Sequence, residues 1–180
     1  MMSPRVIAGD AARSILAQSL GRSVRAIAVS LGPARRSVLC DRGTAAVEPA
    51  KCGVEIARSL AEESGPWSIA PRILVETLVD AERDLQDGTT RLACITGAIF
   101  REGQRAIAAG ASPSAIADSL LQLLPSLDEL LAGQVCATPS VSDLAEAACN
   151  DRELACALSP LGAALHGPGI VDVREGWRSE

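Results

Sequence analysis

The sequence predicts a mainly α-helical protein with one small β-hairpin and a short strand near the C-terminus. Three observations support this fold class. Several long segments place apolar residues at spacings of three and four, which is the period of a helix with one buried face. Glycine and proline residues separate these segments, as they do at helix ends. Aromatic residues make up only 2% of the chain, so the core has to be built from Ala, Leu, Ile and Val.

The composition argues against several classes of protein. The 180 residues are enough for one domain with a sizeable core, and 48% of them are hydrophobic, which is typical of a globular protein. A net charge of −5 and the scarcity of aromatic residues argue against nucleic-acid binding. The chain has no apolar run of about 18 residues, as a membrane helix requires, and its N-terminus lacks the apolar core of a signal peptide. We therefore expect a cytoplasmic protein with no membrane partner.

Six cysteines raise the question of a metal or disulfide site. They form no C-x-x-C pair, and the chain has a single histidine, His166, so the close ligand pairs of a zinc site are missing. Most of the cysteines lie among Ala and Leu, where Cys behaves as a small buried hydrophobe. We expect reduced thiols, and we assign no catalytic role to His166.

The first half of the chain reads as a helix, a hairpin and a second, short helix. The first helix runs from Asp10 to about Ser30 and ends at Gly32-Pro33. Its predicted apolar stripe is Leu16, Leu20, Val24, Ile27 and Leu31. Residues 36–41 and 45–48 are predicted strands, with Pro49 limiting the second to a short or edge piece. A short helix follows at residues 53–60.

Two longer helices follow. One begins near Ile69, with Pro71 in its first turn, where proline is tolerated. Its predicted buried face is Ile73, Leu74, Leu78, Ala81 and Leu85. The next begins at Thr89 or Thr90 and ends at Gly110. Its apolar residues are Leu92, Ile95, Ile99 and Ile107.

The last part of the chain begins with a leucine-rich helix. Ser112-Pro113 starts this helix, and Pro125 should kink or split it. Its apolar residues are Leu120, Leu123, Leu124, Leu127, Leu130 and Leu131. Beyond Thr138-Pro139 we expect helices at residues 140–149 and 150–165 and a strand at residues 170–173. The predicted domains are residues 1–136 and residues 137–180.

Asp87-Gly88-Thr89-Thr90, between the two longer helices, has the composition of an anion site. The first N–H groups of a helix have no partner within the helix and carry the positive end of its dipole, so a phosphate can bind there. Gly88 lets the backbone come close, and the threonines add hydroxyl donors. Asp87 repels a phosphate unless Mg²⁺ lies between them. The alternative is an ordinary helix N-cap after a turn.

Five groups of residues in a fixed order favour the phosphate site. They are Ser30-Leu31-Gly32-Pro33; Lys51-Cys52-Gly53-Val54; Asp87-Gly88-Thr89-Thr90; Glu102-Gly103 with Ala106–Gly110 and Ser112-Pro113; and Gly169–Val173. In order and spacing they resemble the group I chaperonins, the GroEL-like ring-forming ATPases that fold proteins. The first three are similar to the family's Thr-Leu-Gly-Pro, Lys-Asp-Gly-Val and Gly-Asp-Gly-Thr-Thr-Thr.

The resemblance implies a chaperonin equatorial-domain-like helical bundle over residues 1–136 and the ascending part of an intermediate domain over residues 137–180, with no apical domain. It also implies ATP and Mg²⁺ as cofactors. Asp87 would hold the metal ion. The nucleotide would be bound by Leu31, Gly32, Pro33, Lys51, Asp87, Gly88, Thr89 and Thr90.

Two departures from the family's pattern affect the chemistry. Cys52 stands where the family has an acid that helps place the attacking water, and Arg91 stands where it has a third threonine. The family's catalytic aspartate would lie beyond Glu180. We therefore assign no catalytic residue and expect little or no ATP hydrolysis.

Three hypotheses remain open. The first is a truncated chaperonin-like protein that binds ATP and assists the folding or assembly of client proteins. The second is a helical interaction module without nucleotide chemistry, a dedicated assembly factor that self-associates or binds a full-length chaperonin through exposed apolar faces. The third is a non-functional chaperonin remnant.

Overall fold

The computed structural model describes residues 6–32, 36–41, 47–85, 87–135, 143, 146 and 152–164. The chain divides into two compact units, Met1–Pro125 and Ser126–Glu180. Several predicted features lie outside the described residues: Pro33, the domain boundary at residue 136, nearly all of the helix at 140–149, and the strand at 170–173.

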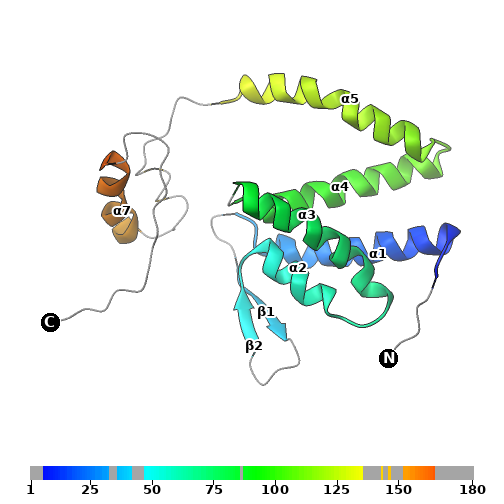
Figure 1. The fold of residues 1–180 in the computed structure, drawn as a ribbon, viewed down its shortest axis with the longest axis horizontal. Coiled ribbons are helices and arrows are strands. Elements are labelled where there is room, and N and C mark those ends of the chain that lie inside the picture. The colour runs from blue at the N-terminus through cyan, green and yellow to red at the C-terminus, as the bar shows by residue number, and fades with distance from the viewer. Residues whose placement is uncertain are drawn as a thin grey trace. The chain divides into compact units, whose positions relative to one another are not determined.

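The described elements confirm the predicted fold class, a mainly α-helical chain with one hairpin (Figure 1). In chain order they are α1 (Gly9–Ala28), β1 (Val38–Asp41), β2 (Val47–Ala50), α2 (Gly53–Ala61), the 3-10 helix η1 (Pro66–Ser68), α3 (Ile69–Leu85), α4 (Thr89–Ala108), α5 (Pro113–Ala132) and α7 (Arg152–Ala164). Among the described residues, no helix combines the length and apolarity that crossing a membrane requires.

The hairpin pairs β1 with β2 in antiparallel register, with Val38 opposite Ala50 and Asp41 opposite Val47. Pro49 lies inside β2, opposite Leu39. A proline has no N–H to donate, but it is tolerated in a strand that has a neighbour on one side only. Cys40 and Ala50 are the buried residues of the hairpin and attach it to the helical core.

The core of the first unit lies between α1, α2, α3 and α4, and α1 and α4 lie side by side along it (Figure 1). Its most buried large side chains are Ile27, Val54, Ile56 and Leu78, each at most 1% exposed. Two buried serines of α1 also belong to it. The Ser19 hydroxyl donates to the Trp67 carbonyl at 2.6 Å, and the Ser23 hydroxyl donates to the Ser19 carbonyl at 2.9 Å.

The predicted buried faces of the helices are only partly right. Leu74 and Leu78 of α3 are buried, but Ile73 and Leu85 are 58% and 72% exposed. Ile95 and Ile99 of α4 and Leu31, beyond the end of α1, are also exposed.

Small residues occupy the places that these side chains were expected to fill. Ala70, Ala93, Ser19 and Ser23 are buried, and a Cβ placed on Gly97 of α4 would lie 2.7 Å from Cγ2 of Val24. The helix backbones thus approach closely along small residues, which a count of large apolar side chains does not register.

Pro125 was expected to kink or split the leucine-rich helix, and it does not split it, because α5 continues through this residue. Proline removes one N–H from the helical ladder and leaves a carbonyl of the preceding turn without its partner. Every residue of α5 except the half-buried Ile116 is exposed, so that carbonyl can bond to water instead.

Replacing Leu78 by Ala should lower the free energy of unfolding by about 2–5 kcal/mol, because it opens a cavity in the core. The matched control is Leu85→Ala, in the same helix, which should change it by less than about 0.5 kcal/mol. Urea unfolding of the two variants measures both values. Equal losses would contradict the assignment of the α3 buried face.

Candidate functional site

Three helix ends meet at one place in the first unit: the C-terminal end of α1 and the N-terminal ends of α2 and α4. The Ser30 hydroxyl, just past α1, lies 3.2 Å from the Thr90 hydroxyl in the first turn of α4. Gly53, the first residue of α2, lies against the backbone of Thr89 and Thr90. Segments far apart in the sequence are therefore neighbours at this junction.

Gly53 is required by the closeness of the two helices. A Cβ built on it would lie 2.9 Å from the Thr90 backbone nitrogen and 3.1 Å from the Thr89 carbonyl carbon. Both neighbours are backbone atoms, which a rotamer change cannot move away. The N-terminal ends of α2 and α4 thus touch through their main chains.

Neither of these helix ends is capped by a side chain. Gly88 is the N-cap of α4 and adopts a left-handed conformation, with φ 84° and ψ 0°, which glycine allows without strain. Its carbonyl accepts the N–H of Leu92 at 2.9 Å. Cys52 is the N-cap of α2, and its side chain makes no capping hydrogen bond. The first N–H groups of both helices are therefore left without a side-chain acceptor at the cap.

The Cys52 thiol instead joins three helices. Its Sγ donates to Oε1 of Glu82 on α3 at 3.6 Å and lies 3.6 Å from the Thr89 hydroxyl on α4. No sequence motif indicated Glu82, because its place beside Cys52 depends on the packing of α3 against α2. Ser30 belonged to a recognised motif, but its bond with Thr90 is a tertiary contact that the spacing did not reveal.

The predicted site residues fall into two groups. Thr89 is buried at 6% exposure, and Gly88 and Thr90 are half-buried at the junction. The exposed residues on the segments that lead into it are Leu31, Gly32, Lys51 and Asp87. Pro33 lies outside the described residues. The structure thus brings together the motifs that contain Leu31-Gly32, Lys51 and Asp87. Two of these motifs carry a charged side chain, Lys51 and Asp87.

The junction suits an anion. Two uncapped helix N-termini in contact place two positive dipole ends together, and a bound phosphate would offset their mutual repulsion. A metal ion alone has few ligands here, since the described residues contain no group of three His, Cys, Asp or Glu side chains that could hold one. Mg²⁺ is commonly bound by one or two carboxylates together with phosphate oxygens, and the exposed Asp87 fits that pattern.

Replacing Gly53 by Ala should lower the free energy of unfolding by about 1–3 kcal/mol, because the new methyl group overlaps the backbone of α4. Gly103→Ala is the control, since a Cβ there meets nothing within 4 Å. It should raise stability by roughly 0.5–1 kcal/mol, as Ala does in a helix interior. Thermal or urea unfolding of both variants tests the contact, and a neutral Gly53→Ala would contradict it.

Replacing Cys52 by Asp should place a second carboxylate beside Glu82 and destabilise the chain at neutral pH by about 1–4 kcal/mol through like-charge repulsion. Cys52→Ser keeps a small neutral donor and is the control. The double variant Cys52→Asp/Glu82→Gln should recover most of the loss in urea unfolding. Failure to recover would show that the Cys52–Glu82 contact is not the cause.

Comparison with known proteins gives a consistent result. The chain is 28% identical over 188 residues to chaperonin GroEL 1 of Rhodopirellula baltica, an alignment that covers 99% of this chain and 32% of that protein. No family model matches the chain. The chain therefore spans about one third of the length of this relative.

Two solved structures with a similar fold are chaperonins. Chaperonin gp146 from bacteriophage EL matches with a TM-score of 0.74 at 20% identity, over 96% of this chain and 32% of that one. A group III chaperonin in the open state matches with a TM-score of 0.69 at 24% identity, over 88% of this chain and 33% of that one. The resemblance of this chain to the chaperonins, predicted from its motifs, is confirmed by these similarities in sequence and fold.

Proposed function

We propose that this chain is a chaperonin-like protein that binds Mg-ATP at the junction of α1, α2 and α4, hydrolyses it slowly or not at all, and assists the folding or assembly of other proteins. The observation that supports nucleotide binding most directly is the contact between two uncapped helix N-termini, Gly53 of α2 and Thr89-Thr90 of α4. The similarity to chaperonins supports the role in folding.

Each residue of the site has a distinct role in this proposal. The N–H groups that follow Gly88, together with the Thr89 and Thr90 hydroxyls, donate to phosphate oxygens. Lys51 adds a positive charge from the segment before α2. Leu31, Gly32 and Pro33 border the nucleotide. Asp87 holds Mg²⁺, which neutralises phosphate charge when it is bound.

Slow hydrolysis follows from Cys52. Activation of water requires a base close to the reacting phosphate. A neutral thiol is a weak hydrogen-bond acceptor and a poor replacement for a carboxylate in that role. Cys52 also directs its thiol to Glu82, so its proton already has an acceptor. We therefore expect binding without efficient turnover.

The second candidate function is an interaction module that does not use nucleotide. Its support is α5, where the leucines are 39% to 66% exposed and no residue is buried. Apolar surface of that extent is typical of partner-binding faces. Client proteins, a full-length chaperonin and further copies of this chain are the proposed partners.

Replacing Asp87 by Ala should weaken Mg-ATP binding by roughly tenfold or more, because Mg²⁺ loses the carboxylate that would hold it beside the phosphates. Asp84→Ala is the control, since Asp84 is an exposed acid three residues earlier that pairs with Arg83. Isothermal titration calorimetry with Mg-ATP measures both, and Mg²⁺ alone should give no comparable heat.

Two results would overturn the nucleotide proposal. One is the absence of binding heat for the unmodified chain at millimolar Mg-ATP. The other is equal affinity of the unmodified chain and Asp87→Ala. Either result would leave the interaction module as the better function.

A further inference from the structure

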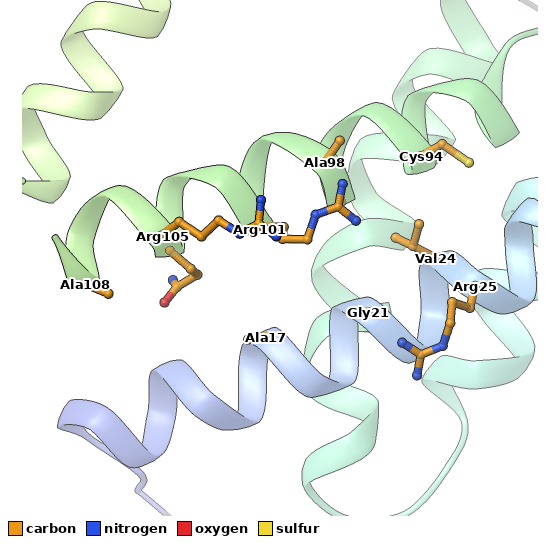
Figure 2. Close-up of a pocket in the computed structure, with 11 residues that line it drawn as sticks. Ala17, Gly21, Val24, Arg25, Cys94, Ala98, Arg101, Arg105 and Ala108 are labelled. Atoms are coloured by element: carbon orange, nitrogen blue, oxygen red, sulfur yellow. The ribbon is translucent and has the colours of Figure 1, made fainter.

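A groove between α1 and α4 lies outside the nucleotide junction. Its volume is about 610 Å³ (Figure 2). Its walls are mostly small or apolar side chains: Ala17, Gly21 and Val24 from α1, and Cys94, Ala98 and Ala108 from α4. Small walls allow another helix to approach closely, and the lining from Cys94 to Ala108 is about 21 Å long at the rise of an α-helix.

Arginine side chains also line the groove. Arg25 comes from α1, and Arg101 and Arg105 come from α4 (Figure 2). Arg101 and Arg105 share one carboxylate, that of Glu102. Within the described residues Arg25 has no ion-pair partner. Three guanidinium groups and one carboxylate leave this rim with a net positive charge.

α5 has the complementary properties. Its leucines between Leu120 and Leu131 are exposed, and they extend over about 16 Å of helix. Its only charged residues are acidic: Asp118, Asp128 and Glu129. The helix therefore offers an apolar face of fitting length with negative charges, while the groove offers an apolar floor with positive charges.

We propose that α5 of one copy of this chain binds in the α1/α4 groove of a second copy, and that the exchange is reciprocal. No residue of α5 is buried, so its leucines are available to a partner. Reciprocal exchange gives a closed dimer in which both apolar faces and both grooves are covered. The proposal does not depend on nucleotide binding.

Charge exchange tests the pairing. The variants Arg101→Glu/Arg105→Glu and Asp128→Arg/Glu129→Arg should each self-associate roughly tenfold more weakly, because each places like charges across its own homodimer. A mixture of the two should form a heterodimer with opposite charges at both contacts. Sedimentation velocity measures all three, with Arg83→Glu as the control because Arg83 is an exposed arginine of α3.

Cross-linking distinguishes two possible occupants of the groove: α5 of a second copy and α5 of the same chain. Leu124→Cys should be joined to Cys94 by a short bis-maleimide, giving a covalent dimer in denaturing electrophoresis. Adding Cys94→Ser should abolish that dimer, although the exposed Cys156 is still present. Circular dichroism checks that each variant is folded.

Three outcomes would overturn the proposal. The unmodified chain could be a monomer at every concentration. The mixed charge variants could fail to associate. The Cys94-dependent cross-link could stay within one chain, which would show that α5 covers its own groove.

Discussion

The main-chain contact between Gly53 and Thr90 is the constraint on which the first unit depends. It brings the start of α2 against the start of α4, and neither helix start has a side-chain cap. Electrostatics opposes such an arrangement, because the positive ends of two helix dipoles lie next to each other and repel. The helices are held there by the buried side chains behind the junction, Val54, Ile56 and Leu78 among them. Core packing thus maintains an arrangement that local helix energetics disfavours.

The sequence predicted the positions of the helices and strands well, but it predicted less well which face of each helix is buried. Gly32, Pro71, Gly88 and Gly110 act through local backbone geometry, so the ends of α1, α3 and α4 could be placed within about two residues. Which face of a helix is buried depends on its neighbours. Ile73 and Ile95 continue an apolar pattern but are exposed, while Ala93 and Ser23, which carry little hydrophobic signal, are buried.

The same distinction between local features and tertiary contacts applies to the candidate site. Asp87-Gly88-Thr89-Thr90 could be recognised because its chemistry is local: an uncapped helix start, glycine and hydroxyls. That Leu31-Gly32 and Lys51 approach it followed only from the resemblance to chaperonins. Glu82 and the contact of Ser30 with Thr90 could not be predicted, since the Cys52–Glu82 and Ser30–Thr90 contacts join residues 30 and 60 positions apart.

Because these contacts join distant parts of the sequence, the junction can form only when the first unit folds. Closing a loop of 60 residues costs chain entropy before the Ser30–Thr90 bond is formed, so the junction is assembled only together with the packing of α1, α2, α3 and α4. A molecule that binds the assembled junction and not the unfolded chain stabilises the whole unit, by about 2.7 kcal/mol at one hundred times its dissociation constant. The melting temperature of this chain therefore reports how much of the junction is occupied by ligand, whether or not the ligand is hydrolysed.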